Sequence, residues 1–384
     1  METLSRALHL EQNVTIDLVS AVVGIIFTAG AIKATQLVIR NKQEKILRSP
    51  KDLILPKLTA AEQELLPYPP DSLPGGRDVD SPYGSMRVFE FGPEDGRKVL
   101  LIHGITTPCI ALGAVAQGMA DRGCRVMLFD LWGRGYSDSP DLPHDDRLFS
   151  TQILLALTSS PLAWTGEGRK FSIIAYSLGG CVATSFTAHS PNLVESLVLL
   201  CPTGLIRSRH LGRQRRVMLA ADYVPEWIME KFVKKTLQKP MYSNENKDDG
   251  KEAGVEEVAR AELEEEEPTT EYPISKKYPH LTVMGAVQWH LQQHPGFVRS
   301  FMSSVRYAPI TGQDATWKKL ALREDKTLII AGTTDPIIIA DEIKEDAERA
   351  LGDKLEWILL PGAHDIPVVD SEAVCGHIAK FWGC

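Results

Sequence analysis

The sequence predicts an α/β fold in which helices cover a mostly parallel, doubly wound sheet and a helical lid is inserted late in the chain. From about residue 85, short apolar runs alternate with stretches of helical spacing. The runs are almost continuously apolar, as expected for strands buried on both faces of a parallel sheet. One long region, 202–319, contains no strand-like run and is too long for a simple connection.

The expected elements follow one another in a regular order. Strands are predicted at 86–91, 98–104, 125–130, 170–176, 196–201, 327–332 and 354–360. Helices are predicted at 111–122, 178–189, 340–351 and 371–382, and Pro191 stops the second of them. Repeated βα units favour a single sheet with right-handed crossovers. The core domain is therefore expected at 85–201 and 320–384.

The strand-free region 202–319 is expected to form the helical lid between the two parts of the core. Between Asn244 and Glu267, eleven acidic residues stand against three basic ones, so a solvated, disordered loop is expected at 240–280. The lid opens with a basic segment, whose arginines are at 207, 209, 213, 215 and 216. These arginines could form a solvated face or lie on anionic lipid headgroups.

The N-terminal region differs in composition from the rest of the chain. Residues 14–32 carry one charge, Asp17, and six basic residues from Lys33 to Lys51 oppose a single acid. This pattern predicts a tail at 1–13, a transmembrane anchor at 14–39 and a tether at 40–84. The basic flank predicts a single-pass membrane protein whose C-terminal domain is cytosolic. A cleaved signal peptide and a soluble or interfacial helix are the alternatives.

Charge and cysteine content narrow the range of partners. The net charge of −8 gives no general reason to expect a nucleic-acid partner. Six scattered cysteines lack zinc-ligand spacing, so free, mostly buried thiols in a reducing compartment are expected. The segment WGRGYSD (132–138) matches neither a dinucleotide fingerprint nor a phosphate-binding loop, and no cofactor is expected.

The stretch AYSLGG (175–180) places Ser177 between an apolar run and the start of a helix. It is similar to a nucleophile elbow, whose usual form is G-x-S-x-G, with Ala175 in place of the first glycine. Because such a turn brings the helix close to the strand, small residues are needed at 175 and 179. Taken alone, a serine before Leu-Gly-Gly is more often a helix N-cap than a nucleophile.

Groups that could activate Ser177 follow later strands. Asp335 comes after the run 327–332, and His364 comes after the run 354–360. In this arrangement His364 would take the proton of the serine and Asp335 would orient His364. The order Ser, Asp, His along the chain differs from the orders in chymotrypsin-like and subtilisin-like enzymes.

An oxyanion hole is expected beside the serine. The strand 98–104 runs into His103 and Gly104, and the glycine lets the loop bend back. The backbone N–H of Ile105 could then join that of Leu178 as a pair of oxyanion donors. Each piece is weak alone, but together, at strand ends and in this order, they predict a hydrolase site.

Two other groups of residues are interpreted as structural. Asp130 ends an earlier strand and is expected to staple a loop. His290 and His294 stand four residues apart on a predicted lid helix, a spacing that suits a metal. No third ligand is evident nearby and Pro295 follows at once, so no metal site is expected.

Residues 85–384 resemble the α/β-hydrolase superfamily. The matching segments are HG (103–104), FDLWGRGYSD (129–138), YSLGG (176–180), TTDP (333–336) and GAHD (362–365). The segment LVLLCPTGL (197–205) is similar to monoacylglycerol-lipase-like and meta-cleavage-product-hydrolase-like members. The N-terminal span and HPGFVRSFMSSVRYAPI (294–310) are similar to fungal membrane-anchored α/β hydrolases, including those of secondary metabolism.

The resemblance implies the same roles that the residues suggest. Ser177 is the implied nucleophile, His364 the base and Asp335 the orienting acid, with Ile105 and Leu178 as oxyanion donors. The expected function is a membrane-anchored serine hydrolase for hydrophobic carboxylic esters, such as a monoacylglycerol, a lysolipid, or an ester or lactone of secondary metabolism. A carbon–carbon bond hydrolase with the same triad and a non-catalytic binding protein with the same fold are the alternatives.

Overall fold

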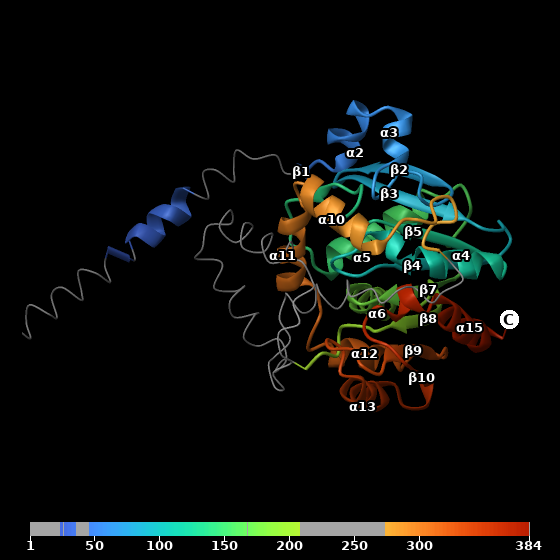
Figure 1. The fold of residues 1–384 in the computed structure, drawn as a ribbon. Coiled ribbons are helices and arrows are strands. Elements are labelled where there is room, and N and C mark those ends of the chain that lie inside the picture. Colours follow the sequence, from blue (N-terminus) through green and yellow to red (C-terminus); the bar gives the residue numbers. More distant parts are fainter. Residues whose placement is uncertain (1–23, 26, 36–45, 167, 208–272, 384) are drawn as a thin grey trace, which may run out of the picture.

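A computed structural model describes residues 24–25, 27–35, 46–166, 168–207 and 273–383. Its centre is an eight-stranded sheet in the order β10-β9-β8-β7-β4-β5-β3-β2, covered by helices (Figure 1). The strands are β2 (Gly76–Ser81), β3 (Gly84–Phe91), β4 (Arg97–Ile102), β5 (Cys124–Phe129), β7 (Phe171–Tyr176), β8 (Val194–Leu200), β9 (Thr327–Gly332) and β10 (Leu355–Leu360). Seven of them confirm the strands predicted from apolar runs.

The order of the strands makes the sheet doubly wound. β4 lies between β5 and β7, so the chain changes direction across the sheet after β5. Strands β4, β5, β7, β8, β9 and β10 are parallel, whereas β3 and β2 are antiparallel to their neighbours. With right-handed crossovers, this reversal puts the helix after β4 and the helix after β7 on opposite faces. The carboxyl ends of β4 and β7 meet at this switch point, where sheets of this type bind ligands.

The helices form two groups. The predicted helices are present as η2 (Cys109–Leu112) continuing into α4 (Gly113–Asp121), α6 (Leu178–His189), α13 (Ala340–Leu351) and α15 (Ser371–Trp382). The chain also forms α5 (Asp146–Thr158) and the short helices α2 (Pro50–Leu53), η1 (Leu55–Lys57), α3 (Ala60–Glu64), η4 (Gly352–Lys354) and α14 (Ile366–Val369). α4 packs against α15, whereas α5, α6, α12 and α13 form a series in which each contacts the next.

The strand-free region contains three described helices, α10 (Val283–Gln293), α11 (Phe297–Tyr307) and α12 (Asp314–Leu320). α10 and α11 lie beside α5 and the loop that follows β5 (Figure 1). Residues 208–272, which include most of the predicted acidic loop and all of the lid arginines except Arg207, lie outside the described residues. Arg207 forms ion pairs with Glu345 and Asp346, and these pairs hold the start of the region 202–319 against α13.

The predicted membrane localisation is wrong. Residues 1–23, 26 and 36–45 lie outside the described residues, and the described part of the predicted anchor is helical at 24–25 and 27–35. Within the part of the chain that the structure describes, no helix is both long and apolar enough to cross a membrane. The predicted single-pass topology and the predicted membrane partner both required that span, so neither is supported.

Described residues from Ile46 up to β3 contribute to the fold. β2 forms the edge of the sheet beside β3, and β1 (Ile46–Leu47) pairs with β6 (Ser139–Pro140) in the loop after β5. Tyr68 is wholly buried, and its hydroxyl lies 3.2 Å from both carboxylate oxygens of Asp130. The sequence does not reveal β2 because this strand reads GRDVDS and carries no apolar run.

Candidate active site

Ser177 occupies a strained turn between β7 and α6. Its φ of 53° and ψ of −118° lie in a region that residues other than glycine rarely adopt. The surrounding backbone holds this conformation. The carbonyl of Ser177 accepts hydrogen bonds from Gly180 N (2.8 Å), Thr203 N (3.1 Å) and the Thr203 hydroxyl (3.1 Å), while its N–H donates to Leu200 O (3.0 Å). Strain that is held in this way is typical of a functional site.

The small residues after the serine are required by close backbone contacts. A Cβ atom at Gly179 would lie 2.3 Å from the carbonyl oxygen of Ile102, at the end of β4. A Cβ atom at Gly180 would lie 2.6 Å from the Pro202 side chain. The start of α6 therefore touches the ends of β4 and β8. The expectation that 179 must be small is confirmed, and Ala175 is wholly buried within β7.

Asp335 and His364 are in direct contact. His364 Nδ1 lies 2.7 Å from Asp335 Oδ2, and both side chains are fully buried. The other carboxylate oxygen, Oδ1, accepts hydrogen bonds from the N–H groups of Ile337 and Ile338, each at 2.8 Å. These donors fix the carboxylate, so Oδ2 must face the imidazole. The carboxylate in turn favours the tautomer that carries its proton on Nδ1.

The histidine loop lies against the end of β9 and beside the serine turn. A Cβ atom at Gly332 would lie 2.4 Å from the carbonyl oxygen of Ala363, so glycine lets the loop approach. The His364 ring is 5.3 Å from the ring of Tyr176, the residue before Ser177. The structure thus brings the three predicted triad residues to one edge of the sheet, at the carboxyl ends of β7, β9 and β10.

The two predicted oxyanion donors also lie at this edge. Leu178 opens α6, and Ile105 follows β4 in the loop that the close approach at Gly179 brings next to α6. His103 shapes this loop. Its Nδ1 lies 2.9 Å from Gly104 O, and its Nε2 accepts a hydrogen bond from Leu131 N at 2.9 Å. The peptide that carries the N–H of Ile105 is therefore oriented by a buried histidine.

Two residues that sequence reasoning passed over belong to the same site. Thr203 bonds the Ser177 carbonyl twice, as described above. Cys201 follows β8 with an unusual φ of 43°, and its thiol lies within 4.8 Å of ligand atoms of Asp335 and His364. Burial and then the Asp335 charge raise the pKa of this thiol well above its usual value. The sequence signal that could have identified them is their position, because both residues follow the carboxyl end of a buried strand, β8.

Cys201, Asp335 and His364 are the one group of possible metal ligands within the described ranges. Their spacing alone would suit a zinc ion. However, two ligands of one tetrahedral zinc lie about 3.3 Å apart, given metal–ligand distances of about 2.0 Å. The 2.7 Å contact between His364 and Asp335 is shorter than that and is a hydrogen bond. The arrangement therefore fits a proton between these two groups better than a metal.

Asp130 acts as the predicted loop staple. Its Oδ1 accepts from Cys109 N and its Oδ2 from Tyr136 N, each at 2.9 Å. Tyr68 adds its hydroxyl from the N-terminal region. Burial raises the pKa of this carboxyl, against the opposing effect of the two N–H donors. The aspartate joins the loops after β4 and β5.

His290 and His294 bond to backbone groups of the loop after β5. His294 Nε2 lies 2.8 Å from Ser137 O, and its Nδ1 accepts from Gly296 N at 3.0 Å. His290 Nδ1 accepts from Gly135 N at 3.2 Å. Both nitrogens of His294 are thus engaged by the backbone, so the pair seats α10 on this loop.

Four buried histidines predict a loss of stability in mild acid. Burial, before any other cause, lowers the pKa of His103 and His144 to about 3, of His294 to about 4, and of His290 well below its usual value. In the unfolded chain a histidine has a pKa of about 6.5. Below that pH the unfolded state takes up protons that the folded state does not, so the unfolding free energy falls by about 1.4 kcal/mol per pH unit for each histidine. The urea midpoint should therefore drop clearly between pH 7.5 and pH 5.5.

A single variant checks the cause of this pH dependence. The Nδ1 of His144 lies 3.0 Å from Leu142 O. His144→Asn keeps a donor for that carbonyl but removes the titrating ring, and it should make the midpoint less dependent on pH. A wild-type midpoint that is the same at both pH values would contradict the prediction.

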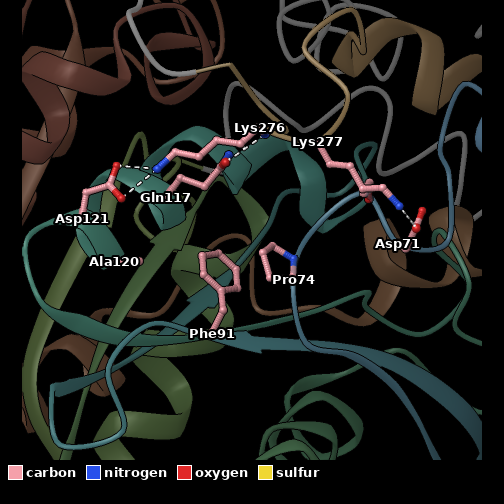
Figure 2. A pocket seen from close by; sticks show the side chains of 9 residues that line it. Asp71, Pro74, Phe91, Gln117, Ala120, Asp121, Lys276 and Lys277 are labelled. Carbon is pink, nitrogen blue, oxygen red and sulfur yellow. Dashed lines mark hydrogen bonds and ion pairs between the residues drawn. The ribbon is translucent and has the colours of Figure 1, made fainter.

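A pocket of about 330 Å³ is lined by residues of the 71–74 loop, Phe91, the C-terminal part of α4 and Lys276 and Lys277 (Figure 2). Phe91 and Pro74 form part of its wall, and Phe91 pairs with Val126 near the start of β5, at the amino ends of the parallel strands. Lys276 and Lys277 cross its rim to pair with Asp121 and Asp71 (Figure 2). These ion pairs fasten residues 276–277 to α4 and the 71–74 loop, and the pocket contains no candidate triad residue.

Comparison with known proteins yields one family. The sequence profile described as alpha/beta hydrolase fold matches residues 98–371. A serine hydrolase-like protein of Danio rerio is 30% identical over 125 residues, which cover 33% of this chain and 37% of that protein. The chain thus matches about a third of the length of this curated relative.

Solved structures share the fold at low sequence identity. A hydrolase from Pseudomonas aeruginosa is 20% identical with a TM-score of 0.53, covering 80% of this chain and 98% of that one. The meta-cleavage product hydrolase from Pseudomonas fluorescens is 16% identical with a TM-score of 0.50, covering 80% and 97%. These likenesses concern the fold alone, and they agree with the resemblance that the motifs carry.

Proposed function

The chain belongs to the alpha/beta hydrolase fold family, and we propose that it is a serine hydrolase that cleaves carboxylic esters of hydrophobic substrates. The observation that carries this proposal is the 2.7 Å contact between His364 and Asp335, both buried, beside a serine held at φ 53°. A buried base with a fixed orienting carboxylate next to a strained serine has the parts that nucleophilic catalysis needs.

In the first half of the reaction, the Ser177 hydroxyl oxygen attacks the ester carbonyl carbon while His364 Nε2 takes the hydroxyl proton. Asp335 stabilises the resulting imidazolium through Nδ1. The N–H groups of Ile105 and Leu178 stabilise the negative oxygen of the tetrahedral intermediate. The carbon–oxygen bond to the alcohol then breaks, and His364 returns the proton to the departing oxygen, which leaves an acyl group on Ser177.

In the second half, water takes the place of the alcohol. His364 removes one proton from the water as its oxygen attacks the acyl carbon, and the same two N–H groups hold the oxyanion. Collapse of the second intermediate breaks the bond to Ser177, and His364 returns the proton to the serine oxygen. The products are a carboxylic acid and the restored enzyme.

Burial of the site supports a hydrophobic substrate. Ser177 is 1% exposed and His364 is fully buried. Neighbouring residues Tyr176, Leu178 and Ile105 are also buried and mostly apolar. An ester that reaches this serine must leave water, and a charged acyl chain would lose its hydration without compensation. A monoacylglycerol, a lysolipid, or an uncharged ester or lactone of secondary metabolism meets this condition at the scissile group.

Labelling with a fluorophosphonate probe tests the proposal. The probe phosphonylates an activated serine, so we expect one adduct per folded chain, located by peptide mass spectrometry on Ser177. Heat-denatured protein is the control, because it retains the serine but loses the contacts to His364 and Asp335. A folded protein that stays unlabelled, or that is labelled on another residue, would contradict the proposal and favour a non-catalytic binding protein.

A substrate panel defines the reaction class. p-Nitrophenyl esters from acetate to palmitate should be hydrolysed, with a preference for the longer acyl chains. Monoacylglycerols, lysolipids and lactones belong in the same panel. Turnover of a meta-cleavage product without turnover of any ester would assign carbon–carbon bond hydrolysis instead.

A further inference from the structure

Arg134 lies in the loop after β5 and is completely buried. A buried positive charge is costly unless hydrogen bonds compensate for its lost hydration. Four neutral oxygens accept from its guanidinium: Ile105 O (3.1 Å), Trp132 O (2.9 Å), Ser300 Oγ (3.1 Å) and Ser304 Oγ (3.0 Å). The geometry suits Arg rather than Lys, because the planar fork directs several donors at once.

These contacts join two parts of the molecule that are far apart in sequence. Ser300 and Ser304 stand four residues apart on α11, so they share one face of that helix. That face lies directly on the loop backbone, since a Cβ atom at Gly133 would be 2.1 Å from Ser300 Oγ. On its other side, Arg134 Nε reaches the carbonyl of Ile105.

The carbonyls on both sides of Ile105 are held by buried side chains. His103 Nδ1 lies 2.9 Å from Gly104 O, in the peptide that includes the N–H of Ile105. Arg134 bonds the next carbonyl, that of Ile105 itself. The first of these two peptides contains the N–H of Ile105, and the second is joined to it through the Ile105 Cα, so holding both restricts the backbone angles at Ile105 and the movement of its N–H. The arginine therefore acts on the predicted oxyanion donor without touching the reacting atoms.

We propose that Arg134 is a positioning residue that couples α11 to the oxyanion donor Ile105. Ser300 and Ser304 fix the guanidinium, and the guanidinium fixes the peptide after Ile105. This inference rests on the proposed function, in which the N–H of Ile105 stabilises the transition state. A defect on α11 should then reduce transition-state stabilisation rather than ground-state binding.

The double variant Ser300→Ala/Ser304→Ala tests the coupling. It removes both α11 acceptors and leaves Arg134 and every triad residue in place. We expect kcat for a p-nitrophenyl ester to fall about tenfold with KM changed by less than about threefold, because an oxyanion contact is made fully only in the transition state. The inhibition constant of an alkyl boronic acid, which forms a tetrahedral adduct on Ser177, should weaken by the same factor.

Ser303→Ala is the matched control on the same helix. Ser303 Oγ accepts from His144 N at 3.0 Å, so this variant also loses one hydrogen bond between α11 and a loop. Its kcat and boronate affinity should stay within about twofold of wild type. Wild-type kcat in the double variant, or an equal loss in Ser303→Ala, would overturn the proposal. If the double variant does not fold, the two single variants give the same comparison with smaller effects.

Hydrogen exchange separates this inference from the proposed function. Wild-type protein that neither hydrolyses esters nor binds the boronate would refute the serine-hydrolase proposal by itself. The coupling still predicts faster amide exchange in residues 104–107 of the double variant than in Ser303→Ala. Equal exchange in the two variants would refute the coupling whatever the activity of the protein.

Discussion

Ser177→Ala is expected to lower kcat/KM for ester hydrolysis by about 10⁴-fold or more, because the acyl-enzyme route is lost and only residual oxyanion stabilisation remains. The fold should persist. The bonds that hold the turn run to the backbone carbonyl and N–H of residue 177, which alanine retains. Alanine also carries the same Cβ at φ 53°, so the backbone strain is unchanged. Initial rates and thermal unfolding of purified protein measure the two effects separately.

Ser185→Ala is the matched control for this experiment. Ser185 is a buried serine of α6 whose hydroxyl donates to Asp146 at 2.9 Å, away from the triad. This variant should lose some stability but keep its activity and its fluorophosphonate labelling. If Ser177→Ala retained more than a few per cent of the wild-type kcat/KM, Ser177 would not be the nucleophile.

The parts of the fold that were predictable are those with a strong local signal. Buried parallel strands such as β7 and β9 are nearly continuous apolar runs. Glycine is required at 179 and 180 because an added Cβ atom would lie 2.3 Å from the Ile102 carbonyl oxygen and 2.6 Å from the Pro202 side chain. Motif order then located Asp335 and His364 at neighbouring strand ends. These features can be predicted from a single sequence because each depends on only a few adjacent residues.

The contacts that support the site could not be predicted in the same way. Arg134 reads as a polar loop residue, yet it is buried because Ser300 and Ser304 arrive from more than 160 positions later. Cys201 meets Asp335 only because β8 and β9 are neighbours in the sheet. A single sequence does not encode such distant pairings in any local period.

The N-terminal error has a different cause. Composition identified an apolar segment, but an apolar composition alone does not establish that a segment spans a membrane. Hydropathy alone led to the membrane interpretation, and no helix among the described residues is both long and apolar enough to cross a membrane.

Asp335→Asn is expected to reduce kcat by about 10³- to 10⁴-fold, an effect of the size that follows when a catalytic histidine is held in the wrong tautomer. The structure gives a specific reason. The N–H groups of Ile337 and Ile338 both donate to Oδ1 of Asp335, so the asparagine oxygen must occupy that position to accept from them. Its amide nitrogen then takes the place of Oδ2 and faces His364.

An amide N–H₂ in that place donates where the carboxylate accepted. His364 Nδ1 must become an acceptor, which moves the ring proton to Nε2. Nε2 then has no lone pair to receive the proton of Ser177, although every heavy atom can keep its position. The Asp335→Asn variant therefore changes the tautomer of His364 without changing the packing around it. Alanine at 335 would also leave the N–H groups of Ile337 and Ile338 without their carboxylate oxygen.

Asp365→Asn provides the matched control, because it makes the same chemical change on the residue next to His364. Asp365 lies at the start of α14 and is not one of the predicted triad residues, so the activity of this variant should stay within about threefold of wild type, as expected for a change outside the triad. Both variants should unfold at temperatures near that of wild type. Comparable losses in the two variants would mean that local charge, and not the tautomer of His364, governs the rate. A large loss of kcat in Asp335→Asn alone would show that catalysis requires the proton of His364 to be on Nδ1.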